Sequence, residues 1–305
     1  MKLSFKKILG YLFVFASLAL AFFYLKIQDN FSLSSSSVNP LEFTFLVFFV
    51  LVSLILNGLK ILWLQSIFKN YLGLVESFSL AGVNAMWNYL PLTGGLAIRG
   101  TYLKQKYKFP WTEFLSTVVA SYLISFIAFG FFGLMVTILL VTEAKIIFLS
   151  IFSILILTPA LVLLVENVLK NIEIEFINKL LKGLLGFKLI FKYKETLIRL
   201  ILLDFLIILI DSSRIFFVSQ FSGKIISFQS ALLITPLTIV ASLINITPGA
   251  LIIREALITF TTTQLNYTLN TGLVISTIDR AAVIVGIFIS GVLGSIYLSK
   301  KLNDG

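Results

Sequence analysis

Two stretches of this sequence share a pattern that is suited to binding a phosphate or another anion. The first runs from Asn88 through Pro91, Gly94 and Gly95 to Arg99, and the second from Asn245 through Pro248, Gly249 and Ala250 to Arg254 and Glu255. Both read Asn-x-x-Pro, small residues and then Arg. Proline ends a helix, glycine lets backbone N–H groups turn toward a ligand, and arginine offers a permanently charged fork of donors. The repeated pattern therefore predicts a site for an anionic head group.

A simpler interpretation of the same pattern stays open. Proline and glycine can act only as helix breaks, and Arg99 and Arg254 can be boundary charges that follow the bias of basic residues toward the cytoplasmic side of a membrane. Under that interpretation neither stretch binds a ligand.

Charged residues inside apolar segments form a second set of candidates. Asp204, Asp211 and Arg214 lie within one apolar stretch, where each costs about 2.5–3.5 kcal/mol at the middle of a bilayer. Asp211 and Arg214 are three residues apart, so one helix face can pair them, and this face is expected to point into the protein. Asp279 and Arg280 lie in the last apolar stretch. Such charges either fix the register of the helices or handle a substrate or protons.

Several kinds of chemistry are excluded by composition. The chain has no Cys and no His, which removes thiolate nucleophiles, imidazole bases and Cys/His metal sites. It has no Gly-x-x-x-x-Gly-Lys-Ser/Thr loop for ATP and no Asp-x-Asp pair in a loop. We therefore expect neither an enzyme nor a protein with a metal or a cofactor.

The rest of the sequence supplies apolar helices that would hold such a site inside a membrane. Of the 305 residues, 58% are hydrophobic and 12% are charged, so lipid must be the main solvent. Stretches long enough to cross a bilayer cover residues 8–25, 43–64, 112–141, 146–166, 197–221, 225–246 and 273–298. We predict an all-α polytopic membrane protein with about seven to eight transmembrane helices.

Two further segments are not predicted to be continuous transmembrane helices. Residues 75–108 and 250–265 contain the proline, glycine and polar positions of the repeated pattern, and each is predicted to be a broken or re-entrant helix. They lie in the two halves of one membrane domain, residues 1–166 and 197–305, which indicates an internal pseudo-repeat. In transporters, paired broken helices of this kind point to the central binding site. Whether each segment crosses or re-enters is left open.

Basic residues predict the orientation and the lipid partner. Lys and Arg outnumber Asp and Glu by 24 to 14, and a cluster lies in the linker 167–196, where lysines alternate with apolar residues. This linker is predicted to be an amphipathic segment at the membrane surface that contacts anionic lipid, and nucleic acid is not expected as a partner. We expect a plasma-membrane protein with a cytoplasmic N-terminus and with residues 8–25 retained as a helix.

The two repeated stretches resemble the signature regions of the lysylphosphatidylglycerol synthase transmembrane, or flippase-like, family. Asn88 to Arg99 is similar to its first region, and Asn245 to Glu255 is similar to its second, although Pro248-Gly249-Ala250 stands where more glycines are usual. The family also has a Glu-Arg pair one helix after the first region, where this chain has Ser121-Tyr122. The resemblance implies a role for Arg280. It does not lead us to expect aminoacyl transfer, because that activity needs a large soluble domain.

These observations leave three candidate functions. The one we favour is translocation of a lipid or a polyprenyl-phosphate-linked glycan, with its anionic head group at the two broken segments. The alternatives are a non-transporting scaffold or subunit that holds a membrane or cytoplasmic enzyme of lipid or glycan synthesis, and a membrane-embedded transferase. The sequence does not indicate the lipid, the energy source or the oligomeric state.

Overall fold

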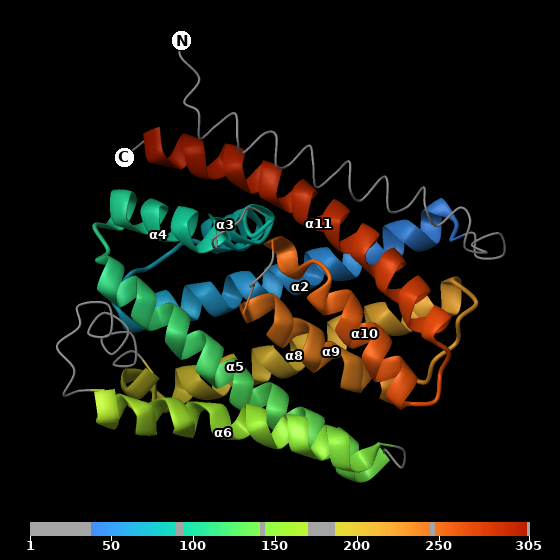
Figure 1. Ribbon diagram of the computed structural model, residues 1–305. Helices are drawn as coiled ribbons and strands as arrows, with labels where there is room; N and C mark the ends of the chain where they lie inside the picture. Colours follow the sequence, from blue (N-terminus) through green and yellow to red (C-terminus); the bar gives the residue numbers. More distant parts are fainter. Residues whose placement is uncertain (1–37, 90–93, 141–143, 170–186, 245–247, 304–305) are drawn as a thin grey trace.

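The computed structural model describes residues 38–89, 94–140, 144–169, 187–244 and 248–303, and over these ranges the chain is helical, without a strand (Figure 1). The helices are α2 (Pro40–Ile67), α3 (Leu74–Trp87), α4 (Gly94–Tyr107), α5 (Trp111–Leu140), α6 (Lys145–Leu169), α8 (Lys194–Phe221), α9 (Phe228–Ile244), the short η2 (Pro248–Ala250), α10 (Ile253–Gln264) and α11 (Leu269–Asn303). The predicted helix at residues 8–25 and most of the linker 167–196 lie outside the described residues.

Long apolar helices form the frame of the molecule. Among the residues that the structure describes, four helices are long and apolar enough to cross a membrane: α2, α5, the Lys145–Leu164 part of α6, and α11. α8 has the same 28-residue length as α2 and lies antiparallel beside it. Phe45 of α2 contacts Phe217 and Phe221 near the end of α8, whereas Lys60 of α2 pairs with Asp204 near its beginning. The prediction of an all-α polytopic membrane protein is confirmed.

The first broken segment is a helical hairpin. α3 and α4 pack against each other, and the ends of both meet the last turn of α11, because Glu76 in α3 pairs with Lys301 at 2.6 Å and Lys106 in α4 donates to the Lys301 carbonyl at 2.9 Å. The chain therefore enters and leaves at one end of the molecule. The other ends of α3 and α4 lie toward the middle of the molecule (Figure 1).

The second broken segment contains α10, which packs against α9 before it and forms with it a hairpin from the opposite end. The hydroxyl of Tyr267, just after α10, accepts a hydrogen bond from the Ser227 N–H before α9 and from the Ser230 hydroxyl. Both ends of the α9–α10 pair thus lie beside the start of α11. α11 has 35 residues and measures about 52 Å at 1.5 Å per residue, so the two hairpins enter from opposite ends of the same long helix.

This arrangement differs from the expectation that residues 225–246 form a crossing of their own. The chain turns back after α9 because Pro248-Gly249-Ala250 makes a tight turn in which Gly249 and Ala250 have φ angles of 60° and 53°. Positive φ is easy for glycine and costly for alanine, so this turn is held by its surroundings. Both broken segments belong to helical hairpins, and α11 ends at the same end of the molecule as Lys104 and Lys106.

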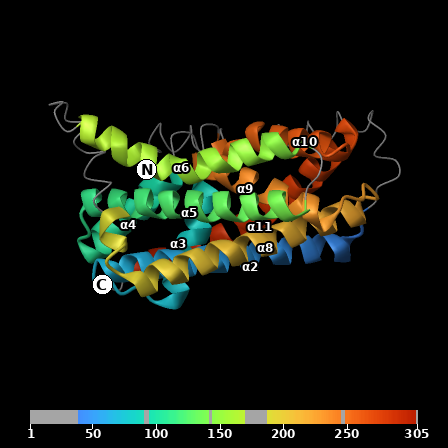
Figure 2. The ribbon, with the colours of Figure 1, turned by 90° about the horizontal axis from the view of Figure 1, so that it is seen from below.

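Small residues let the first hairpin approach α11 closely. A side chain at Gly82 would meet the backbone of Ser290, one at Gly291 would meet Met86, and one at Gly294 would meet the backbone of Ser79. Close approach through small residues is the usual way for helices to associate in lipid, where hydrophobic burial gives little driving force. The glycines of α11 therefore hold α3 at a fixed depth. A view turned by 90° shows α2, α5, α6 and α8 lying nearly side by side (Figure 2).

Candidate functional site

A polar cavity of about 250 Å³ lies where the two hairpins and the long helices meet. Seven helices contribute polar or charged side chains to its wall. These are Ser53, Asn57, Lys60 and Gln65 of α2, Asn84 of α3 and Asn88 just after it, Arg99 of α4, Thr117, Ser121, Tyr122 and Ser125 of α5, Asp204, Asp211 and Arg214 of α8, Thr238 and Ser242 of α9, and Arg254 of α10. Polar groups at this depth of an apolar bundle are expensive, and their usual setting is a water-filled cavity or a substrate path.

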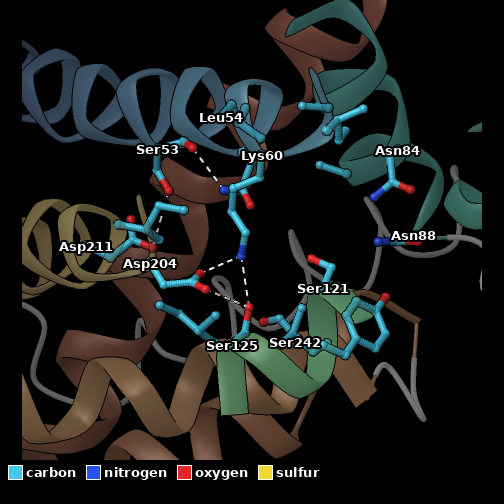
Figure 3. A pocket seen from close by; sticks show the side chains of 18 of the residues that line it. Ser53, Leu54, Lys60, Asn84, Asn88, Ser121, Ser125, Asp204, Asp211 and Ser242 are labelled. Carbon is cyan, nitrogen blue, oxygen red and sulfur yellow. Dashed lines mark hydrogen bonds and ion pairs between the residues drawn. The ribbon is translucent and has the colours of Figure 1, made fainter. Parts of the chain in front are cut away.

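On one wall of the cavity, Lys60 and Asp204 form a buried ion pair. Lys60 Nζ lies 2.5 Å from Asp204 Oδ1, and the side chains are 9% and 0% exposed. The Ser125 hydroxyl joins both, accepting from Lys60 at 2.9 Å and donating to Asp204 Oδ2 at 3.0 Å. Figure 3 shows Lys60 reaching from α2 toward Asp204 and Ser125, with Asn84 and Asn88 across the cavity. The charge of Asp204 is therefore neutralised inside the protein.

A second chain of ion pairs connects α8, α10 and α11. Arg214 binds Asp211 at 2.5 Å and Asp279 at 2.7 Å, and the other oxygen of Asp279 binds Arg254 at 2.6 Å. The predicted pairing of Asp211 with Arg214 is confirmed, and both face the interior as expected. One nitrogen of Arg254 is thus already paired with Asp279. The spacing of the sequence did not predict this pair.

The tips of the two hairpins touch each other. The Gly249 N–H donates to the Asn88 carbonyl at 2.8 Å, and a side chain at Gly249 would collide with the ring of Tyr89. Arg280 joins both tips, because it donates to the Tyr89 hydroxyl at 3.2 Å and to the Gly249 carbonyl at 2.8 Å. The repeated pattern seen in the sequence is therefore brought together in space.

Arg280 is anchored rather than exposed to the cavity. Its guanidinium also pairs with Glu255 at 2.5 Å, and the residue is 9% exposed. It does not line the cavity wall. The contacts of Arg280 and Glu255 therefore join the hairpin tips. The sequence had placed Glu255 among the head-group residues and Arg280 among the intramembrane charges.

Arg99 has a different environment from the other arginines. Its guanidinium carbon lies 5.1 Å from the centre of the Phe114 ring, and no carboxylate of the described residues pairs with it. Its Nε is buried without a hydrogen-bond partner. A buried guanidinium without an anion is costly, so this group is suited to receiving one from a ligand.

Two more buried polar atoms at the cavity lack a partner. They are the Nε of Arg254, a donor, and the Oδ1 of Asn84, an acceptor. Together with Arg99 Nε they give the wall two charged donors, one from each hairpin, and one neutral acceptor. This set can bind an anion that also carries a hydroxyl or another donor.

The remaining predicted residues have structural positions or lie outside the description. Gly94 begins α4, and Gly95 packs so closely on Asn84 and Asn88 that no side chain fits there. Pro91 and Asn245 lie outside the described residues, and of Pro248 only the backbone turn is described. Within the described ranges, no group of three or more acidic side chains is placed to hold a metal ion.

Sequence reasoning missed the roles of Lys60, Ser125 and Tyr89. Lys60 is the only charge in the apolar part of α2, and a lone lysine there is a signal that a carboxylate elsewhere must neutralise it. Ser125 and Tyr89 carry no such signal, because serine and tyrosine are common in membrane helices.

Comparison with known proteins bears on the whole chain. No curated protein and no solved structure matches it. The family model described as the lysylphosphatidylglycerol synthase TM region matches residues 7–291, which is most of the sequence. The match includes both hairpins and the long helices around the cavity. This multi-pass membrane protein therefore belongs to the family of lysylphosphatidylglycerol synthase transmembrane regions.

Proposed function

We propose that this protein is a carrier, not an enzyme, that moves an amphiphile with an anionic head group across the membrane. The head group of a phospholipid or of a polyprenyl-phosphate-linked sugar enters the polar cavity while its apolar chains stay in lipid. The observation that carries the proposal is the cavity where two oppositely directed hairpins meet, with Arg99 in its wall and no carboxylate of the described residues to neutralise it.

The physical basis is the cost of taking a charged head group out of water. An unpaired ion in a low-dielectric interior is unfavourable by tens of kcal/mol in the idealised limit. A cavity that offers guanidinium donors and room for water lowers this barrier. Hairpins that enter from opposite ends and meet in the middle resemble the inverted repeats that surround substrate sites in many transporters.

The orientation belongs to the same proposal. Lys104, Lys106 and Lys301 gather at one end of the molecule, and basic loops favour the cytoplasm. We place this end at the cytoplasmic face of the plasma membrane, with the N-terminus on the same side. The tips of both hairpins then lie within the bilayer.

The test is lipid movement between leaflets in liposomes that contain the purified protein. Fluorescent phosphatidylglycerol and a fluorescent polyprenyl-phosphate sugar serve as cargo, and quenching from outside reports the rate. Arg99→Gln should slow movement by about 10- to 100-fold, because it removes a charge-assisted hydrogen bond of about 1.5–3 kcal/mol. Arg199→Gln is the matched control, since Arg199 is exposed and lies away from the cavity, where it pairs with Glu195 on its own helix and contacts the Trp63 ring.

Two results would count against transport. One is equal rates for wild type, Arg99→Gln and protein-free liposomes with every cargo. The other is unchanged wild-type rates in Arg99→Gln. Equal inactivity of correctly folded protein would favour the scaffold function, in which the basic linker recruits an enzyme.

A further inference from the structure

The charged side chains at and around the cavity nearly cancel one another. The cations are Lys60, Arg99, Arg214, Arg254 and Arg280, and the carboxylates are Asp204, Asp211, Asp279 and Glu255. Each carboxylate binds at least one cation at 2.5–2.7 Å. Arg99 is the one cation of this set that no described carboxylate neutralises.

We propose that the head group taken by this cavity carries a single net negative charge, as a phosphodiester, together with at least one hydroxyl. This inference rests on the proposed function and names the substrate class of the same site. One negative charge brings the buried cluster to neutrality through Arg99. The phosphodiester oxygens accept from the Nε donors of Arg99 and Arg254, and a hydroxyl donates to Asn84 Oδ1.

Head groups with any other charge leave an uncompensated charge inside the cavity. A second negative charge would lie near Asp204 and Asp211 in the wall, and the cations able to neutralise it already hold carboxylates. A zwitterionic head group would neutralise Arg99 but would bring a new cation that has no free carboxylate. In a low-dielectric interior either uncompensated charge is unfavourable. The cluster therefore selects by net charge.

The volume limits the size of the head group. A cavity of about 250 Å³ is slightly below the range of roughly 300–1,000 Å³ typical of sites for drug-sized ligands. It suits a phosphate with a glycerol or a single sugar, and not an oligosaccharide. Phosphatidylglycerol and a monosaccharide linked to a polyprenol through one phosphate share this chemistry.

The experiment compares lipids in the liposome assay with the full-length protein. The two monoanionic lipids just named distinguish the two sources of the head group. Phosphatidylcholine tests a zwitterionic head group, and phosphatidylpropanol tests a monoanionic head group without hydroxyls. Phosphatidylinositol 4-phosphate is compared with phosphatidylinositol, which has the same ring and less negative charge. We expect at least one hydroxylated monoanionic lipid to move about tenfold or more faster than the zwitterionic and the multiply charged lipid.

The outcomes separate the two proposals. Equal rates for all charge types, or a preference for zwitterionic or multiply charged lipids, would overturn the charge rule while transport stands. No movement of any lipid would overturn transport and with it the charge rule. A phosphatidylpropanol rate equal to that of phosphatidylglycerol would remove the hydroxyl requirement.

Variants of Arg99 test whether this residue causes the preference for monoanionic lipids. Arg99→Lys keeps the charge and should keep the preference for monoanions, whereas Arg99→Gln should reduce it about tenfold or more toward parity. If Arg99→Gln fails to fold, wild-type protein in detergent replaces it. Short-chain dihexanoyl phosphatidylglycerol should then raise the unfolding temperature, and dihexanoyl phosphatidylcholine should not. An equal rise with both would contradict the proposal.

Discussion

At the residue scale, the cost of the buried charges explains why they occur in clusters. Asp204 lies at 0% exposure in the interior of an apolar helix, where only Lys60 and the Ser125 hydroxyl stabilise its charge. A buried ion pair repays its desolvation only with good geometry and further hydrogen bonds. The pair therefore fixes α2, α5 and α8 relative to one another, and it also keeps its carboxylate from competing with a bound anion.

The pair predicts an unequal response to single and double replacement. Asp204→Asn should destabilise the protein by about 3–5 kcal/mol, because it leaves the Lys60 ammonium buried without an anion. Lys60→Met combined with Asp204→Leu removes both charges and should be closer to wild type. Thermal unfolding in detergent measures both. An Asp204→Asn variant as stable as the double variant would show that Lys60 reaches water or another anion.

The sequence predicts part of this cluster and the fold supplies the rest. The charges of α8 are conspicuous because they interrupt an apolar segment, and their spacing indicates a shared face. Their partners cannot be read from spacing, since Asp204 pairs with a residue 144 positions away and Arg254 with one 25 positions away. Only the packing of α2, α8 and α11 brings those atoms together.

At the element scale, the two hairpins depend on contacts at both their tips and their ends. Proline and glycine predict that a helix breaks, but they do not predict whether the chain then continues or returns. Return is decided by long-range contacts, Glu76 with Lys301 for the first hairpin and Tyr267 with Ser227 for the second. This is why the sequence identified both broken segments and left their topology open.

The tip contact can be tested by cross-linking, because the chain has no cysteine of its own. Tyr89→Cys with Gly249→Cys should be joined by a short thiol-specific cross-linker in native membranes, since a side chain at Gly249 points at the Tyr89 ring. Tyr89→Cys with Ser227→Cys is the control, because Ser227 lies at the far end of the second hairpin. Cleavage between the halves followed by electrophoresis detects the link. Equal yields for both pairs would contradict the tip contact.

At the scale of the whole molecule, a buried carboxylate ties the first hairpin to the end of the chain. Glu76 lies in the first turn of α3, outside the spanning helices, and accepts hydrogen bonds from Tyr102 at 2.5 Å, Tyr107 at 2.8 Å and Lys301 at 2.6 Å. Burial alone would raise the pKa of Glu76, but these donors outweigh it and hold the pKa below its usual value. The carboxylate is therefore charged at neutral pH.

These contacts of Glu76 should make the folded protein less stable at acidic pH. A carboxyl whose pKa is lowered by folding stabilises the native state above its unfolded pKa of about 4.3, and the contribution is lost as the pH falls through the native pKa. The unfolding temperature of wild type should fall on going from about pH 6 to below about pH 4. Glu76→Gln should have a lower unfolding temperature at pH 6 and a smaller change with pH. A variant with the wild-type profile would exclude Glu76 as the source.

The opposed hairpins also fix which parts of the chain face the same side of the membrane. Lys104, in the last turn of the first hairpin, and Lys300, at the end of α11, are exposed at one end of the molecule, and Thr268 is exposed at the other. Single cysteines at these positions should be labelled by a membrane-impermeant maleimide from two different sides, with Lys104→Cys and Lys300→Cys sharing the cytoplasmic side. Right-side-out cells and inverted vesicles provide the comparison. If the second broken segment crossed instead of re-entering, the number of crossings between Lys104 and Lys300 would become odd, and these two cysteines would be labelled from opposite sides.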